Sequence, residues 1–285
     1  MTAKILDGRA VAHRLLDDVA ADTSRFVEEF GRTPVLATVL VGDDPASHTY
    51  VRMKANRCAE VGMLSRRIDI DAGVATGKLV QQIEQLSSDP EVDGILLQHP
   101  VPGHIDERAA FEAIAPSKDV DGVTRTSFAT MAFAEKGFDS ATPGGIMRLL
   151  AAYDIPLAGQ RAVVIGRSPI LGKPMGMLLL GQNATVTYCH SKTTDLAREV
   201  EGADVVVAAA GIPELVRGAW IKPGSVIIDA GYADNRGDVE FEAAAARASF
   251  ITPVPGGVGP MTIATLLAQT IAAARRHEAE NRRQP

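Results

Sequence analysis

Residues 162–174 read Ala-Val-Val-Ile-Gly-Arg-Ser-Pro-Ile-Leu-Gly-Lys-Pro. The short apolar run 162–165 predicts a buried parallel strand, which Gly166 ends. Gly172 lies where a helix can begin, and Pro174 suits a first helical turn because its missing N–H has no intrahelical partner there. The stretch therefore predicts a strand, a glycine turn and a helix start.

This build directs backbone N–H groups at a phosphate, and Arg167 and Ser168 in the turn can donate to anionic oxygens. The spacing is neither Gly-x-Gly-x-x-Gly nor a P-loop, because five residues separate Gly166 from Gly172 and a proline follows Lys173. An ordinary tight turn between a strand and a helix is the alternative interpretation.

Strands and short helices alternate after this stretch, which is typical of a parallel α/β sheet. We expect strands at 184–189, 203–208 and 225–229, and helices at 173–181 and 194–201.

The first half of the chain shows a similar alternation, and a last helix follows it at the other end. The expected helices are 8–30, 45–61, 76–88, 106–115, 142–153 and 261–276, and the expected strands are 34–41, 64–70 and 93–99. Residues 123–140 give no clear pattern. The sequence thus predicts two α/β domains, 1–140 plus 261–285 and 141–260.

Tyr50 and Lys54 stand at positions i and i+4 of the helix expected after Asp44-Pro45, so their side chains share a face. A phenol and an amine in the first turns of a helix that follows a buried strand make a candidate reaction site. The alternative is a solvated lysine beside a half-buried tyrosine.

Gln98 ends the strand that begins near Asp93, where open α/β sheets bind ligands. His99 beside it is a candidate base or a structural histidine. Asp121, in Lys118-Asp-Val-Asp-Gly122, can accept two hydrogen bonds from an amidine-like ligand edge or cap a turn.

The strand expected at 184–189 ends in His190, Ser191 and Lys192, without the carboxylate that grips the ribose 2′-hydroxyl of NAD. Together with Arg167, this end favours a 2′-phosphate and therefore NADP, and a solvated basic turn is the alternative. Small residues at 209–211 and 229–231 allow the backbone to approach a ligand closely.

Composition narrows the function classes. The 285 residues carry a formal net charge of −6 without a basic block, which argues against nucleic acid as a partner. No apolar run is long enough to span a bilayer, and the N-terminus does not read as a signal peptide. Cys58 and Cys189 are too few for a disulfide framework or a zinc site, so we expect a cytoplasmic protein without a metal.

Six segments, taken in order, resemble the bifunctional methylenetetrahydrofolate dehydrogenase/methenyltetrahydrofolate cyclohydrolase family over nearly the whole chain. They are Tyr50-Val-Arg-Met-Lys54, Asp93-Gly-Ile-Leu-Leu-Gln98, Lys118-Asp-Val-Asp-Gly122, Gly166-Arg-Ser168 with Gly172-Lys-Pro174, Ala184-Thr-Val-Thr-Tyr-Cys-His-Ser191, and Pro253-Val-Pro-Gly-Gly-Val-Gly-Pro-Met-Thr262.

The resemblance implies oxidation of 5,10-methylenetetrahydrofolate by NADP and hydrolysis of the methenyl product to 10-formyltetrahydrofolate. It also implies a homodimer, an active site between two domains, and a C-terminal helix that returns to the first domain. The implied catalytic and folate-binding residues are Lys54, Tyr50, Gln98 and Asp121, with Pro255, Gly256 and Gly257 at the substrate. The implied cofactor-binding positions are Gly166, Arg167, Ser168, His190, Ser191 and Tyr232.

Two departures from the family pattern stand out. Ser140-Ala141 replaces a common Pro-Cys, with little expected effect, and Tyr232 replaces a smaller aliphatic residue beside the nicotinamide or ribose. Two other functions compete with the bifunctional enzyme: a dehydrogenase that has lost the cyclohydrolase activity, and a folate- or nucleotide-binding regulator without turnover.

Overall fold

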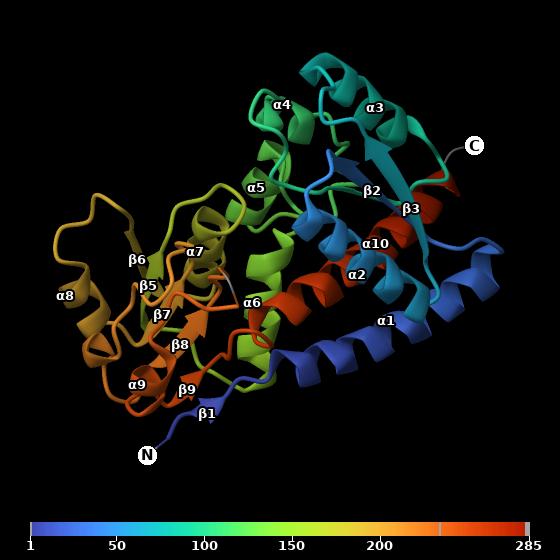
Figure 1. The fold of residues 1–285 in the computed structure, drawn as a ribbon. Coiled ribbons are helices and arrows are strands. Elements are labelled where there is room, and N and C mark those ends of the chain that lie inside the picture. Colours follow the sequence, from blue (N-terminus) through green and yellow to red (C-terminus); the bar gives the residue numbers. More distant parts are fainter. Residues whose placement is uncertain (1, 234, 283–285) are drawn as a thin grey trace. The chain divides into compact units, whose positions relative to one another are not determined.

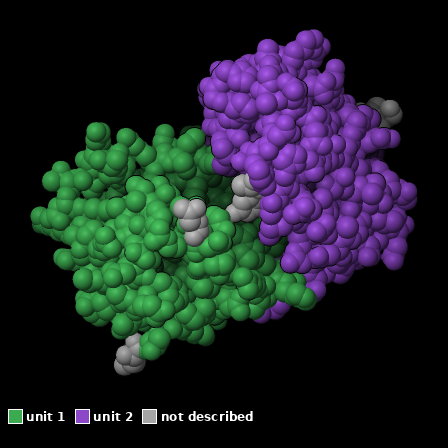
Figure 2. All heavy atoms as spheres, in the orientation of Figure 1, with its two compact units in different colours: residues 1–13, 131–135, 140–265 green, residues 14–130, 136–139, 266–285 purple. Residues whose placement is uncertain are grey.

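The computed structural model describes residues 2–233 and 235–282, and of Ala46 and Tyr50 it describes the backbone alone. The chain forms two compact units, coloured separately in Figure 2. Unit 1 comprises residues 1–13, 131–135 and 140–265, and unit 2 comprises residues 14–130, 136–139 and 266–285.

Unit 2 contains a three-stranded parallel sheet in the order β3-β2-β4, whose strands are labelled in Figure 1 except for β4. Its elements are β2 (Val35–Val41), α2 (Pro45–Glu60), β3 (Leu64–Ile70), α3 (Thr76–Ser88), β4 (Gly94–Leu97), α4 (Glu107–Glu112) and most of α5 (Arg125–Ala132). The central strand β2 is almost wholly buried, whereas none of the residues of the outer strand β3 is buried. This burial explains why β2 reads as a continuous apolar run.

Unit 1 contains a six-stranded parallel sheet in the order β1-β9-β8-β7-β5-β6. Its strands are β1 (Lys4–Ile5), β5 (Arg161–Ile165), β6 (Thr185–Cys189), β7 (Val205–Ala208), β8 (Val226–Asp229) and β9 (Phe250–Ile251). Its helices are α6 (Ala141–Ala152), α7 (Gly172–Gly181), α8 (Leu196–Glu201), α9 (Phe241–Ala245) and the 3₁₀ turn η1 (Gly218–Trp220). The valines and isoleucines of β5, β7 and β8 form its buried core.

The strand order of unit 1 reverses at β5. The chain passes from β5 to β6 on one side, and then to β7, β8 and β9 on the other. In open parallel sheets a ligand binds outside the carboxyl ends of the strands at such a reversal. The turns that follow β5 and β7 are therefore the expected walls of a ligand crevice.

The structure confirms the predicted two-domain α/β fold with parallel sheets. The unassigned stretch 123–140 contains α5, and three short elements, β1, α9 and η1, were not predicted. The pairing of β1 with β9 places the first residues with the six-stranded sheet. The predicted boundaries of the folate domain, 1–140 plus 261–285, and of the NADP domain, 141–260, stay a prediction.

The long helices α1 (Gly8–Phe30) and α10 (Val258–Asn281) each have residues in both units. The end of α10 belongs to unit 2, where the Arg275 guanidinium binds the Asp22 carboxylate on α1 and Gln269 Nε2 donates to Val120 O at 2.7 Å. The predicted return of the C-terminal helix is confirmed, although α10 starts three residues earlier and ends five residues later than expected.

Candidate functional site

Lys54 projects from α2 in unit 2. Asp44 caps this helix by accepting a hydrogen bond from Ser47 N at 2.7 Å, and Pro45 occupies its first turn, as the sequence predicts. Lys54 Nζ donates to Gln98 Oε1 at 2.9 Å. Tyr50 lies in α2 one turn before Lys54, but its side chain lies outside the part that the structure describes.

Gln98 follows β4 and is 9% exposed. Its backbone N–H donates to Val39 O, and its side-chain Nε2 donates to His99 O, both at 2.8 Å. Because the carboxamide nitrogen is engaged by a carbonyl, the oxygen is the end left to accept from Lys54. The sequence-predicted amine and carboxamide are therefore brought together in a fixed orientation.

Asp121 completes this cluster through its charge. Burial lowers the pKa of Lys54, and the nearby Asp121 carboxylate partly opposes that shift. Burial also raises the pKa of Asp121, with a smaller contribution from Asp119, while Lys54 and His99 act in the other direction. A buried amine whose pKa is lowered can exchange a proton more readily at neutral pH.

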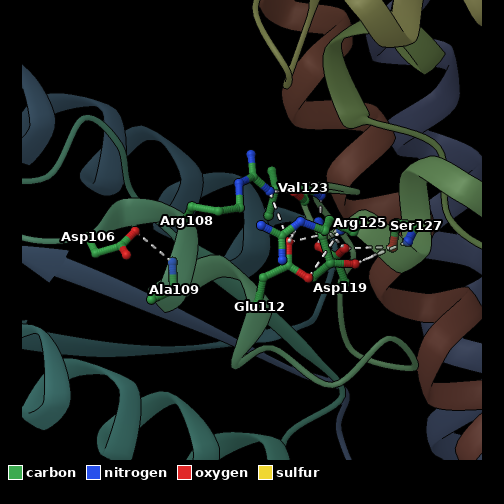
Figure 3. A network of polar contacts seen from close by, with 9 residues as sticks. Asp106, Arg108, Ala109, Glu112, Asp119, Val123, Arg125 and Ser127 are labelled. Atoms are coloured by element: carbon green, nitrogen blue, oxygen red, sulfur yellow. Dashed lines mark hydrogen bonds and ion pairs between the residues drawn. The ribbon is translucent and has the colours of Figure 1, made fainter.

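Asp119 holds the loop that carries Asp121 (Figure 3). Its side chain is fully buried, and its carboxylate accepts hydrogen bonds from Val123 N at 3.1 Å, Thr124 N at 2.9 Å and Ser127 Oγ at 2.6 Å. Ile95 N on β4 also donates to Lys118 O at 2.9 Å. The sequence reasoning did not identify Asp119; its signal was a second aspartate two residues before the ligand candidate.

Side chains of helix α4 also form hydrogen bonds with the backbone that follows this loop. Arg108 Nη1 donates to Val123 O at 2.7 Å, and Glu112 Oε1 accepts from Arg125 N at 3.1 Å, as Figure 3 shows. Thr124 Oγ1 accepts from Ser127 N at 3.1 Å, which is the bond of an N-cap residue at the start of α5. This side-chain support was not visible in the sequence pattern of residues 123–140.

In unit 1, the predicted glycine turn lies at the point where the strand order reverses. A Cβ at Gly166 would lie 2.2 Å from Ala209 O, and one at Gly172 would lie 2.4 Å from Gly166 O. Gly166 also has φ +130°, which side chains disfavour. Both positions need glycine because the backbone segments after β5 and β7 and at the start of α7 touch one another.

The sequence predicts that backbone N–H groups at the start of α7 are free to bind a phosphate, but the structure shows them bonded to Ser168. Its Oγ accepts from Leu171 N at 3.1 Å and from Gly172 N at 3.2 Å, and its carbonyl accepts from Lys173 N at 3.0 Å. The first N–H groups of α7 are therefore occupied within the turn. The hydroxyl proton of Ser168 is left to donate, together with the exposed guanidinium of Arg167.

The turn after β6 lies beside the glycine turn, because Gly166 N donates to Cys189 O at 2.9 Å. His190 Nδ1 accepts from Lys192 N at 3.1 Å, and His190 N donates to Thr193 Oγ1 at 2.8 Å. The histidine ring thus shapes this turn, and Ser191 and Lys192 are exposed. A 2′-phosphate would meet hydroxyl and cationic groups here, which fits NADP.

The remaining predicted positions of unit 1 lie on two other loops. Tyr232 follows β8, is 51% exposed, and donates from its hydroxyl to Asn235 Oδ1 at 2.6 Å. Gly256 has φ +114° and its carbonyl accepts from Arg9 N at 3.2 Å, while a Cβ at Gly8 would lie 1.7 Å from Gly257 O. The loop of Pro255, Gly256 and Gly257 therefore packs tightly on the start of α1, and its contact with substrate stays a prediction.

Within residues 2–233 and 235–282, no group of three or more His, Cys, Asp or Glu side chains is arranged to hold a metal ion. The helices described in the same ranges are all too short or too polar to cross a membrane.

Comparison with known proteins places this geometry in a family. The model of the tetrahydrofolate dehydrogenase/cyclohydrolase catalytic domain matches residues 6–121, and the model of the NAD(P)-binding domain of the same enzymes matches residues 140–278. The chain belongs to the tetrahydrofolate dehydrogenase/cyclohydrolase family. The first match contains Lys54, Gln98 and Asp121, and the second contains the glycine turn.

Individual members of the family agree over almost their whole length. Bifunctional protein FolD 1 of Salinispora arenicola is 66% identical over 97% of this chain and 100% of its own. The crystal structure of the bifunctional FolD enzyme from Campylobacter jejuni has a TM-score of 0.93 at 40% identity and covers 96% of this chain and 99% of its own. The FolD structure from Trypanosoma brucei, complexed with NADP and an inhibitor, has a TM-score of 0.93 at 36% identity, covering 97% and 98%.

Proposed function

We propose that Lys54 carries the proton transfer of this bifunctional enzyme and that the turns after β5 and β6 hold its cofactor. The enzyme oxidises 5,10-methylenetetrahydrofolate to 5,10-methenyltetrahydrofolate with NADP⁺, and then hydrolyses the methenyl compound to 10-formyltetrahydrofolate. The observation that supports the proposed roles most directly is the hydrogen bond from Lys54 Nζ to Gln98 Oε1 at 2.9 Å. The charge of Asp121 also acts on Lys54.

In the dehydrogenase step, NADP⁺ when bound accepts the hydride that leaves the one-carbon bridge of the folate. The protein then contributes mainly by positioning the folate for hydride transfer from its one-carbon bridge. Asp121 suits the pterin, because a carboxylate can pair with its amino and ring N–H groups as it does with a guanidinium. We assign Tyr50, Pro255, Gly256 and Gly257 to the border of the folate.

In the hydrolysis step, water adds to the methenyl carbon and loses a proton, and a folate nitrogen gains a proton as its bond to that carbon breaks. Lys54 can perform both transfers if it accepts the first proton as a neutral amine and returns it as an ammonium. Gln98 supports this role, since it holds the amine by a hydrogen bond without adding a charge that would raise the pKa of Lys54.

The cofactor preference is tested by replacing Arg167 with alanine. We expect the Michaelis constant for NADP to rise tenfold or more and that for NAD to change little, because only NADP carries the phosphate that an arginine binds. Arg198→Ala is the control, since Arg198 is an exposed arginine on α8 of the same unit. Equal effects of Arg167→Ala on both cofactors would contradict the assignment of the 2′-phosphate.

The two competing functions are separated by one absorbance assay. The bifunctional enzyme forms the methenyl compound with NADP and then consumes it, a dehydrogenase alone would accumulate it, and a regulator would form none. The intact cluster of Lys54, Gln98 and Asp121 supports the first outcome.

We further propose that the enzyme is a cytoplasmic homodimer with a folate domain of residues 1–140 plus 261–285 and an NADP domain of residues 141–260. The outer strand β6 ends the six-stranded sheet, and Leu180 on the preceding helix is 55% exposed, which supports a partner at this edge. Light scattering coupled to size-exclusion chromatography tests the dimer, and cell fractionation tests the compartment.

A further inference from the structure

Two buried carboxylates lie at the carboxyl end of β8, outside the groups assigned so far. Asp229 ends the strand and is 4% exposed, and Asp238 lies nine residues later and is 1% exposed. Each accepts hydrogen bonds from backbone N–H groups of neighbouring loops, and no lysine, arginine or histidine among residues 2–233 and 235–282 forms an ion pair with either. They are therefore held by the backbone rather than by an ion pair.

Asp229 fixes the segment on which Asp238 stands. Its Oδ1 accepts from Asp238 N at 2.9 Å and from Gly231 N at 3.0 Å, and its Oδ2 accepts from Val239 N at 2.9 Å. A Cβ at Gly237 would lie 2.0 Å from Asp229 Oδ2, so the loop is in direct contact with the carboxylate. Asp229 thereby determines where the Asp238 side chain starts.

Asp238 in turn fixes the turn after β7. Its Oδ2 accepts from Ala210 N at 2.6 Å and from Gly211 N at 3.0 Å. Its Oδ1 is buried without a hydrogen-bond partner among the described residues, so the two bonds at Oδ2 are the polar contacts of this carboxylate. Gly211 has φ +68°, a conformation that glycine leaves easily unless something holds it.

The turn held by Asp238 forms one wall of the predicted cofactor crevice. Ala209 N donates to Ile165 O at 2.8 Å, and Ala209 O lies where a side chain on Gly166 would have to go. Residues 209–211 therefore face the glycine turn across the reversal of strand order. A displacement of this turn would change the width of the crevice.

From this geometry we infer that Asp238 is a positioning residue for the dehydrogenase step. Its carboxylate holds the backbone of residues 209–211 in the conformation that NADP requires, without touching the reacting atoms. This role rests on the proposed placement of NADP at the turns after β5 and β6. The cluster of Lys54, Gln98 and Asp121 belongs to unit 2, so we expect the cyclohydrolase step to be independent of Asp238.

Asp238→Ala and Asp238→Asn test the inference, with each activity assayed separately on its own folate substrate. For Asp238→Ala we expect the Michaelis constant for NADP to rise at least tenfold, while the cyclohydrolase rate, measured without NADP, stays within twofold. Asp238→Asn should show a smaller rise, because one carboxamide oxygen still accepts both N–H groups. Amide hydrogen exchange at Ala210 and Gly211 should accelerate in Asp238→Ala.

Asp204→Ala is the matched control. Asp204 accepts a backbone hydrogen bond from Arg161 N at 2.9 Å and pairs with Lys222, but it precedes β7 and so lies at the opposite edge of the same sheet. We expect this variant to leave the Michaelis constant for NADP unchanged. If Asp204→Ala raises it as much as Asp238→Ala does, the effect is general destabilisation and the inference is wrong.

The inference is also overturned if Asp238→Ala leaves the Michaelis constant within twofold, or if both activities fall together. Should Asp238→Ala fail to fold, Asp238→Asn decides: faster exchange at residues 210 and 211 with an unchanged Michaelis constant contradicts the role. Arg167→Ala separates the two proposals, because an unchanged Michaelis constant for NADP in that variant would refute the cofactor placement itself.

Discussion

At the scale of single residues, the chemistry depends on one amine with unusual surroundings. Lys54 is bound to a neutral carboxamide, and burial lowers its pKa. Replacing Lys54 with methionine should reduce the cyclohydrolase rate by a factor of about 10² to 10⁴, the usual contribution of a positioned acid–base group. Decay of the methenyl absorbance measures the rate, and NADP binding should stay near the wild-type value.

Lys54→Arg is the control for this prediction. An arginine keeps the positive charge near Asp121 but does not release its proton at neutral pH. If the lysine acts by proton transfer, both variants lose the hydrolysis step. If arginine restores the rate, the charge of Lys54 matters and its titration does not.

The same residues show what a sequence reveals at this scale. Lys54 and Gln98 were predicted as candidates from a helix start and a strand end, and the structure joins them by a hydrogen bond. Asp119 and Asp238 were missed because most of their partners are backbone N–H groups, which every sequence contains and no pattern marks. Ser168 was identified, but its bonds to Leu171 and Gly172 depend on the exact path of the turn.

At the scale of elements, the contact between the glycine turn and the start of α7 determines the cofactor site. Gly172→Ala would place a methyl carbon 2.4 Å from Gly166 O, so one of the two segments must move. We expect the Michaelis constant for NADP to rise at least tenfold, because movement of a positioning group by about 1 Å can cost that much or more. Steady-state dehydrogenase kinetics measure the effect.

Gly181→Ala is the matched substitution at the other end of the same helix. A Cβ there meets no heavy atom within 4 Å, so the Michaelis constant should stay at the wild-type value. A normal Michaelis constant in Gly172→Ala would show that the turn tolerates the shift and would contradict its role in shaping the cofactor site.

Elements with a strong local pattern were predicted well, whereas those made by distant contacts were not. Helix α3 and strand β3 have the predicted bounds, because apolar spacing and turn residues define them locally. Strand β1 has two residues, and it exists because Lys4 N donates to Ser249 O and Leu6 N donates to Ile251 O. No local signal precedes such a pairing, since the partner lies some 245 positions away in the chain.

At the scale of the whole molecule, the buried Asp229 links stability to pH. Burial raises its pKa to about 6, and the charge of Asp238 adds to the shift, while three backbone hydrogen bonds oppose it. Its ordinary pKa is 3.8. Between pH 3.8 and about 6, the folded protein therefore keeps a proton that the unfolded chain has lost. This group stabilises the fold at low pH, and the stabilisation disappears as the pH rises through about 6.

Asp229→Asn removes this titration and so changes how stability depends on pH. From the two pKa values, the wild-type carboxyl stabilises the fold by about 1.4 kcal/mol more at pH 5 than at pH 8. The variant should be less stable than the wild type at both pH values, because an amide nitrogen faces Val239 N–H or Asp238 N–H in place of an acceptor. The difference in unfolding free energy, measured by denaturant titration, should be larger at pH 5 than at pH 8. A difference that is constant with pH would mean that Asp229 has the same pKa in the folded and unfolded chains. The three hydrogen bonds that it accepts from backbone N–H groups would then fully offset the effect of burial on its pKa.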